Sequence, residues 1–427
     1  MSELRARRIT MMNMMKNVAK KLLLIFLSVL FGLGICEGGV RILGYRYTGS
    51  FFTLDPLLGW SLRPGASAWQ VDEGVAWVKI NSHGYRDRER AISKPPAVYR
   101  VALLGDSFTE ARQVDLDKTF ASLAEEELNR RHCLGDRKVE VLNFGTLGYN
   151  TGQELIQLRE RGWKFSPDMV VLNFYSGNDI IDHVRELNTV LPELVPYFRL
   201  KDGELEVDHG FRRGLKFDPT YIRLRGLATD ALNASELALM VCKLRMASAQ
   251  RKEMEREMAR VYAAKESADT NALPTQYSRF IHYLPPTIPS MVEAWQVTEA
   301  LIAEFGKEVR SHKAPMLLMI TPLPIQFHPD PKAQEAFRVD HKIDSLEYAD
   351  DRVERQARAN GIPTLRLEKP LLDEARRLGT YMAGFANSPP NELHLNERGH
   401  AVVAREMVRA VCEIAGAVGR QVTRKRY

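Results

Sequence analysis

Short apolar runs alternate with longer segments predicted as helices from residue 99 onward, and this alternation limits the folds open to the chain. The apolar runs predict five strands, at residues 99–104, 139–143, 169–174, 316–320 and 364–367. The segments between and after them predict helices at residues 118–131, 152–163, 290–312, 344–360 and 397–415. Strands that alternate with helices form a parallel sheet covered on both faces. We therefore expect an α/β fold with a doubly wound, five-stranded parallel sheet.

The alternation breaks once, at about residues 180–289. This stretch includes a segment rich in charged residues, 228–265, that is predicted as one long helix. Its Leu, Met and Val positions are expected to pack on the domain rather than to form a partner-binding face. We interpret 180–289 as a helical insertion beside the ligand-binding edge of the sheet, within a domain that covers residues 99–415.

The net charge of +6 is concentrated at the two ends of the chain. Residues 1–21 carry six basic side chains against Glu3, and the tail from Arg420 carries four basic side chains, so the remainder is slightly acidic. A protein that binds nucleic acid concentrates its positive charge on its folded body. The distribution argues against a nucleic-acid partner.

An uncharged run rich in Leu, Ile and Phe, residues 22–36, directly follows two lysines. Extended to residue 43, it is long enough to cross a bilayer. We interpret residues 22–43 as an uncleaved transmembrane signal anchor, preceded by a basic cytoplasmic segment (1–21) and followed by a juxtamembrane segment (44–98). Basic residues before the span place the later domain outside the cytoplasm, on the periplasmic side of the inner membrane. A basic tail, 416–427, ends the chain.

Three alternatives to an uncleaved anchor remain open for this run. The segment 32–34 could be a signal-peptidase site, although it lacks the usual Ala-x-Ala pattern. Cys36 could be lipid-modified, although the preceding Ile35 is not small. The run could also be a buried core helix, against which the flanking lysines argue.

The four cysteines are too few and too scattered for a disulfide-rich scaffold or a zinc site. One structural disulfide is possible, but the spacing selects no pair. The sequence also has no cluster with metal-ligand spacing and no phosphate-binding glycine loop, so we expect no metal and no cofactor.

Four residues with chemical potential lie at predicted strand ends or before the last helix. Ser107 follows the first strand, Gly145 the second and Asn178 the third, and His394 precedes the last helix. Successive parallel strands end at one edge of the sheet, so these distant residues can meet there. Ser107 could attack an ester carbonyl with His394 as its general base. The N–H groups of Ser107 and Gly145 and the Asn178 amide could stabilise the oxyanion.

This arrangement resembles the SGNH (GDSL-type) hydrolase family over about residues 99–415. Gly105-Asp106-Ser107 matches the nucleophile block, Gly145 the glycine block, Gly177-Asn178-Asp179 the asparagine block and His394 the histidine block. The resemblance implies a flavodoxin-like three-layer fold and an esterase, lipase or related acyl-transfer activity.

The region before the predicted domain carries a second resemblance. The N-terminal anchor and the segment Asn81-Ser82-x-Gly84-x-Arg86-Asp87 look like those of membrane-anchored bacterial members of the same family. Asp106 and Asp179 are expected to hold the loops that carry Ser107 and Asn178 rather than to act as bases.

One position departs from the family's pattern. The resemblance implies an aspartate three residues before the histidine, and this chain has Asn391 there. An aspartate would fix the tautomer of His394 and stabilise its imidazolium. Glu392 could take that role, Asn391 could assist, a Ser–His dyad could use a backbone carbonyl, or the site could be largely inactive.

We predict an extracytoplasmic serine esterase that acts on a small-molecule or glycan ester, such as an O-acylated envelope glycan or exopolysaccharide. A polysaccharide O-acyltransferase would use the same residues, so the sequence does not separate transfer from hydrolysis. A catalytically degenerate, glycan-binding protein is the third alternative, and only Asn391 favours it.

Overall fold

The computed structural model describes residues 2–188, 191–213, 217–248, 281–389, 391 and 393–424. Its centre is a parallel sheet of five strands in the order β11-β10-β7-β5-β6. The strand bounds are β5 Val98–Gly105, β6 Lys138–Asn143, β7 Met169–Tyr175, β10 Met316–Thr321 and β11 Thr364–Arg366. This is the flavodoxin-like order of a doubly wound sheet. The predicted fold class is confirmed, and each predicted strand is present within two residues of its expected ends.

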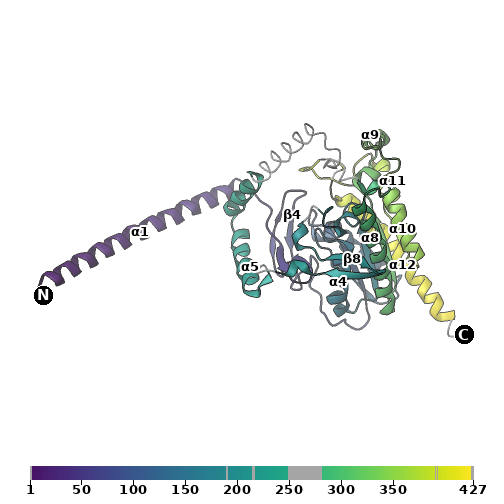
Figure 1. Ribbon diagram of the computed structural model, residues 1–427, viewed down its shortest axis with the longest axis horizontal. Helices are drawn as coiled ribbons and strands as arrows, with labels where there is room; N and C mark the ends of the chain where they lie inside the picture. The colour runs from purple at the N-terminus through teal and green to yellow at the C-terminus, as the bar shows by residue number, and fades with distance from the viewer. Residues whose placement is uncertain are drawn as a thin grey trace.

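Helices cover both faces of the sheet and make a three-layer domain (Figure 1). One face packs on α4 Thr151–Glu160, α8 Pro289–Ser311 and α10 Tyr348–Ala359. The other packs on α3 Phe120–Arg131, α11 Glu368–Leu378 and α12 Glu397–Arg424. In β5, Ala102 and Leu104 face the first layer, whereas Val101 and Leu103 face the second. Every residue of β5 is buried, as expected of a strand covered on both sides.

A single long helix, α1 Ser2–Ile42, projects from the domain (Figure 1). Its stretch Met11–Ile42 is long and apolar enough to cross a membrane, and none of its most apolar window is buried against the protein. The core-helix alternative is therefore wrong. A signal sequence has the same length and composition, so α1 is a candidate membrane span.

The segment 44–98, predicted from sequence to be juxtamembrane, contains two antiparallel hairpins. The first pairs β1 Phe52–Asp55 with β2 Gly59–Leu62, and the second pairs β3 Ser67–Gln70 with β4 Ala76–Lys79. Their inward side chains form a small core of their own, which includes Phe51, Leu62, Val78 and Ile80. This segment is thus an ordered part of the protein rather than a linker.

The predicted long helix at 228–265 is wrong in its first part. The insertion contains a hairpin of β8 Tyr197–Lys201 and β9 Glu204–Asp208, then α5 Pro219–Asn233 and a separate helix at 236–248. The chain breaks between the two helices because Ser235 caps the second one, its hydroxyl accepting the Ala238 N–H. Residues 249–265 lie outside the described residues. The sequence also did not predict α11 or α9 Pro331–His341.

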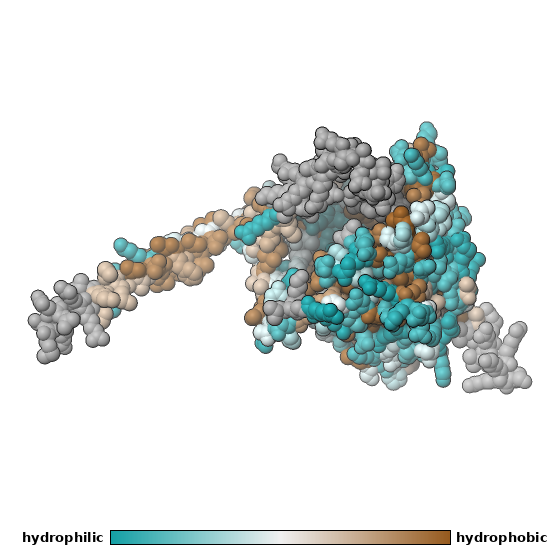
Figure 2. Space-filling model, viewed as in Figure 1, coloured by the Kyte–Doolittle hydropathy of each residue, from teal (hydrophilic) through white to brown (hydrophobic). Residues whose placement is uncertain are grey.

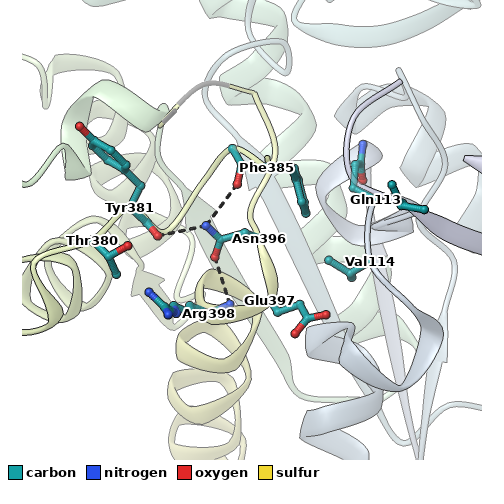
Figure 3. A pocket seen from close by; sticks show the side chains of 10 residues that line it. Gln113, Val114, Thr380, Tyr381, Phe385, Asn396, Glu397 and Arg398 are labelled. Carbon is teal, nitrogen blue, oxygen red and sulfur yellow. Dashed lines mark hydrogen bonds between the residues drawn. The ribbon is translucent and has the colours of Figure 1, made fainter. Parts of the chain in front are cut away.

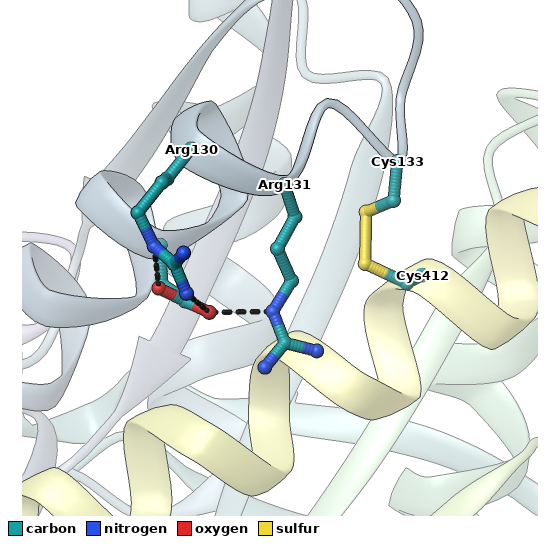
Figure 4. The surroundings of a disulfide bond; sticks show 5 residues. Arg130, Arg131, Cys133 and Cys412 are labelled. Atoms are coloured by element: carbon teal, nitrogen blue, oxygen red, sulfur yellow. Dashed lines mark hydrogen bonds and ion pairs between the residues drawn. A yellow bond between two sulfur atoms is a disulfide. The ribbon is translucent and has the colours of Figure 1, made fainter.

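A disulfide joins Cys133, just after α3, to Cys412 within α12 (Figure 4). Their Cα atoms are 5.5 Å apart although 279 residues separate them in the chain. Both helices lie on the same face of the sheet, so the bond ties the C-terminal helix to the first half of the domain.

Candidate active site

Ser107 begins a short helix, α2 Ser107–Glu110, directly after β5. Asp106 caps this helix, since its Oδ1 accepts the Phe108 N–H at 2.9 Å. The turn needs glycine at position 105, because a Cβ there would lie 2.1 Å from the Thr109 hydroxyl oxygen. The strand end, the glycine and the cap together hold Ser107 at the carboxyl edge of the sheet.

Arg86 anchors the far end of α2. Its buried guanidinium donates to the carbonyl of Glu110 at 2.9 Å, and also to the carbonyls of Ala111 and Val114. Burial lowers the pKa of Arg86 to about 10, and the nearby Glu110 opposes that shift. The segment 81–87 therefore holds the helix that begins at Ser107.

His394 lies against Ser107, as the sequence predicted for a general base. Its Nε2 is 2.8 Å from the Ser107 Oγ, within hydrogen-bonding distance for proton transfer. The ring is half-buried and packs against Phe108, with ring centres 5.0 Å apart. The two residues are 287 positions apart in the chain and meet because α12 begins at the same edge as β5 ends.

The carboxylate that hydrogen-bonds the His394 ring is that of Glu73, a residue not predicted from the sequence. Its Oε2 lies 2.5 Å from the His394 Nδ1, and its Oε1 accepts the His394 backbone N–H at 2.9 Å. A carboxylate at Nδ1 holds the imidazole with Nε2 free to accept the serine proton. Ser107, His394 and Glu73 thus form a continuous hydrogen-bonded chain.

Asn391, one of the two residues proposed from sequence to orient His394, does not contact the ring. The Asn391 amide donates to the Pro324 carbonyl at 2.9 Å, and its buried Oδ1 has no partner among the described residues. Asn391 adopts a φ of +54°, which asparagine tolerates better than most residues. Glu392 lies outside the described residues.

Glu73 stands in the turn between β3 and β4, and Asn387 holds that turn against the histidine loop. The Asn387 amide donates to the carbonyls of Val71 and Gly74 at 2.9 and 3.0 Å, and its Oδ1 accepts the Gly74 N–H at 2.9 Å. Gly74 has a φ of +66°, and a Cβ there would lie 2.1 Å from the Gln113 carbonyl oxygen. No local sequence pattern distinguishes this turn carboxylate from a solvated one.

Two of the expected oxyanion donors lie beside the nucleophile. The Ser107 N–H is at the start of α2 and has no partner among the described residues. The Asn178 amide donates to Asp106 Oδ2 at 3.1 Å and more weakly to the Tyr149 carbonyl at 3.4 Å. Asp106 therefore positions the Asn178 side chain as well as capping α2.

Gly145 differs from its expected role. Its N–H donates to Asn143 Oδ1 at 2.9 Å, and a Cβ on it would lie 2.4 Å from the Glu110 nitrogen. This glycine allows the loop after β6 to pack closely on α2, and its amide is already engaged. In the next turn, Gly148 has a φ of +73° and an N–H with no partner within the described part of the chain. It precedes Tyr149, whose carbonyl contacts Asn178.

Several carboxyl groups lie buried beneath the site. Burial raises the pKa of Asp106 to about 6 and that of Asp182 to about 7. Burial also raises the pKa of Glu154 and Asp179 well above their usual values, reinforced by the negative charge of their neighbours. Asp179 holds the loop after β7, accepting the Tyr175 N–H at 2.7 Å and the Thr151 hydroxyl at 2.9 Å. Asp106 and Asp179 therefore have the structural roles expected of them.

A groove of about 330 Å³ lies between the acid-bearing hairpin and the histidine loop (Figure 3). Gln113 lines it on one side and also donates to Glu73 at 3.4 Å. Asn396 lines the other side and hydrogen-bonds the Tyr381 carbonyl. Ser107 and His394 are not among the lining residues, so this groove lies nearer to Glu73 than to Ser107. Within the described ranges, no group of three or more His, Cys, Asp or Glu side chains could hold a metal ion.

Comparison with known proteins finds similar solved structures but no sequence match. No protein-family model matches the chain, and no curated protein matches it. An acetyl xylan esterase structure, AlAXEase, is 13% identical with a TM-score of 0.37, covering 73% of this chain and 99% of that chain. A lipase/acylhydrolase from Enterococcus faecalis is 13% identical with a TM-score of 0.36, and the match covers 74% of this chain and 96% of that chain. An acetylxylan esterase from Geobacillus stearothermophilus is 11% identical with a TM-score of 0.36, and the match covers 73% of this chain and 93% of that chain. Such distant likeness leaves the function to be argued from this chain's own site.

Proposed function

We propose that this protein is a serine ester hydrolase with Ser107 as nucleophile, His394 as general base and Glu73 as the orienting acid. The observation that carries the proposal is the unbroken hydrogen-bonded chain from Ser107 Oγ through both ring nitrogens of His394 to the Glu73 carboxylate. Glu73 supplies the negative charge that Asn391 lacks, which argues against a catalytically degenerate site.

In the first half of the reaction, Ser107 Oγ attacks the ester carbonyl carbon while His394 Nε2 takes the hydroxyl proton. Glu73 stabilises the resulting imidazolium. The tetrahedral intermediate then breaks its bond to the alcohol oxygen, which receives the proton from His394 and leaves. The acyl group stays on Ser107 as an ester.

In the second half, a water molecule replaces the alcohol. His394 takes a proton from the water as its oxygen attacks the acyl carbon, and the proton then returns to Ser107 as the carboxylic acid is released. A sugar hydroxyl in place of water would give acyl transfer by the same steps.

The negative oxygen of each tetrahedral intermediate needs preorganised donors. We assign these to the Ser107 N–H, the Gly148 N–H and the Asn178 amide. The amide would keep its hydrogen bond to Asp106 and turn its other N–H from the weak 3.4 Å contact with the Tyr149 carbonyl to the oxyanion. Gly148 takes the place expected for Gly145, because the Gly145 N–H is bound to Asn143 whereas the Gly148 N–H has no protein partner in the described chain.

The same proposal places the domain outside the cytoplasm, anchored by α1. The basic residues before the span support this orientation. The Cys133–Cys412 disulfide also supports it, since such bonds persist in oxidising compartments. The substrate class that fits this location is an O-acylated glycan of the envelope or an exopolysaccharide.

Labelling with a serine-directed fluorophosphonate tests the proposal. The wild type should label, Ser107→Ala should not, and Ser345→Ala, which changes a serine outside the site, should label normally. A wild type that does not react, or equal labelling of Ser107→Ala, would overturn it. Release of acetate from a p-nitrophenyl ester, with and without a glycan acceptor, then separates hydrolysis from transfer.

A further inference from the structure

Two helices of the insertion present apolar side chains that nothing in the described structure covers. In α5, no residue is buried, and Leu224 and Leu227 are 61% and 59% exposed. In the helix at 236–248, Leu244 is 63% exposed. Isolated helices of this length are marginal in water, so a helix with so little packing needs another partner for its apolar face.

The exposed apolar residues lie on the side of each helix that points away from the domain. In α5, Gly226 lies against the Arg63 side chain and Asn233 hydrogen-bonds Ser50, so these two residues face the body. At about 3.6 residues per turn, Leu224 falls on the opposite side and Leu227 lies between that side and the flank of the helix. This stripe is therefore a surface turned outward rather than a loosely packed core.

The second helix has the same arrangement. Leu239 is buried, and Lys243, one turn later, pairs with Asp72 on the body. Val241 and Leu244 lie on the other side of the helix and are exposed. The two helices together form an outward apolar surface, which we call the insertion pad (219–233 and 236–248).

The insertion pad is attached to the end of the candidate membrane span. Arg41 donates to the Ala234 carbonyl at 2.8 Å, and Glu37 accepts the Ser235 hydroxyl at 2.8 Å and the Leu237 N–H at 2.9 Å. Glu37 and Arg41 lie in the last turns of the candidate span, so the junction of the two pad helices lies at the end of the span nearest the domain. Figure 1 shows α5 running across the direction of α1 at this point.

Charge also favours a membrane over a protein surface. Arg223 and Arg245 are exposed on the pad helices and have no ion-pair partner among the described residues. Basic residues that flank an exposed apolar face are typical of helices that lie in the headgroup region of anionic bilayers. In Figure 2, apolar side chains gather on the side of the body from which α1 leaves.

We propose that the insertion pad is a membrane-surface site that binds the headgroup region of a bilayer containing anionic phospholipid. It rests on α1 being an uncleaved anchor, as in the proposed function. The pad would hold the domain in a fixed orientation on the membrane, in place of free rotation about the end of α1.

The test uses the full chain in lipid nanodiscs. Cys36→Ala and Cys242→Ser remove the two free thiols, and a fluorescent probe is placed on Leu224→Cys, Leu244→Cys or Val339→Cys. Val339 is the matched control, since it is 65% exposed on α9. Nanodiscs are made of phosphatidylcholine with or without phosphatidylglycerol, and quenching by doxyl-labelled lipid is compared with quenching by aqueous iodide.

We expect probes at 224 and 244 to be quenched by the doxyl lipid and protected from iodide. The doxyl quenching should be stronger when the nanodiscs contain phosphatidylglycerol. The probe at 339 should be quenched by iodide and not by the doxyl lipid. Iodide quenching at all three sites would overturn the proposal. Protection from both quenchers, with cross-linking between copies, would assign the pad to a second copy of the chain and would also overturn it. In a second variant, the probe is placed at Leu227→Cys and the pad is disrupted by Leu224→Glu and Leu244→Glu. This variant should lose quenching by the doxyl lipid but keep fluorophosphonate labelling. Because probe depth does not depend on catalysis, an unlabelled Ser107 would refute the proposed function and leave this result unaffected.

Discussion

Glu73 accepts hydrogen bonds from both the backbone N–H and the imidazole Nδ1 of His394, a residue 321 positions later in the chain. The carboxylate comes from a hairpin outside the parallel sheet, whereas the histidine belongs to the loop before α12. The juxtamembrane segment therefore completes the candidate active site. A fragment without residues 44–98 would lack the acid.

Glu73→Gln should lower kcat/KM for a p-nitrophenyl ester by about 10⁴-fold, by analogy with the loss of the orienting acid in a serine protease. Glutamine has an NH2 donor in place of one carboxylate oxygen, so one of the two His394 N–H groups would face a donor where Glu73 offers an acceptor. Asn391→Asp is the matched control and should leave the rate nearly unchanged, because Asn391 contacts Pro324 and not the ring. A large gain from Asn391→Asp would contradict the assignment of Glu73.

Asn387→Ala should reduce kcat while leaving the protein folded. Its three hydrogen bonds hold the turn that carries Glu73, so their loss frees the carboxylate to move away from His394. We expect a kcat loss with little change in KM, and partial recovery in Asn387→Asp, which retains the acceptor for the Gly74 N–H. Circular dichroism checks the fold, and an unchanged kcat in Asn387→Ala would show that the turn is held by other contacts.

Asn178→Ala should lower kcat by about 10²–10³-fold, the usual effect of removing one oxyanion donor. The reason is that the amide nitrogen lies beside Asp106, next to the nucleophile. Steady-state kinetics on an activated ester measure the change, and fluorophosphonate labelling should slow in parallel. A rise in KM of the same size, with kcat unchanged, would indicate a role in substrate binding instead.

Asp182→Asn should flatten the dependence of stability on pH. The folded-state pKa of Asp182 is raised by burial from 3.8 to about 7, so the folded protein holds this proton more tightly than the unfolded chain. Stability from this group is therefore present below about pH 4 and is lost as the pH rises toward 7. Between about pH 5 and 7, the melting temperature of the wild type should fall by more than that of the variant. Asp340→Asn, an exposed change on α9, should follow the wild type.

Cys412→Ser should destabilise the domain by about 2–4 kcal/mol, because the disulfide closes a long loop and reduces the conformational entropy of the unfolded chain. Urea unfolding under oxidising conditions measures the loss. The same variant under reducing conditions should match the reduced wild type, since neither then has the Cys133–Cys412 bond. Equal stability of oxidised wild type and variant would show that the bond does not form.

The sequence predicted the sheet and much of the site, because both depend on local patterns. Apolar runs of strand length, separated by helical segments, determine a parallel sheet. The polar residue after each strand then falls at one edge. For this reason the meeting of Ser107, Asn178 and His394 at that edge could be predicted without coordinates.

Contacts between distant segments were decided only by the tertiary structure. From its local sequence, Glu73 is an ordinary turn carboxylate, and no neighbouring residue in the chain indicates that it contacts His394. The pairing of Cys133 with Cys412 and the engagement of the Gly145 amide by Asn143 likewise depend on how separate loops pack. Strand and helix patterns are properties of neighbouring residues, whereas the partner of a loop side chain is set by the packing of the whole domain. The sequence alone therefore predicted that Ser107 and His394 meet, and the fold decided which carboxylate lies against the other side of the His394 ring.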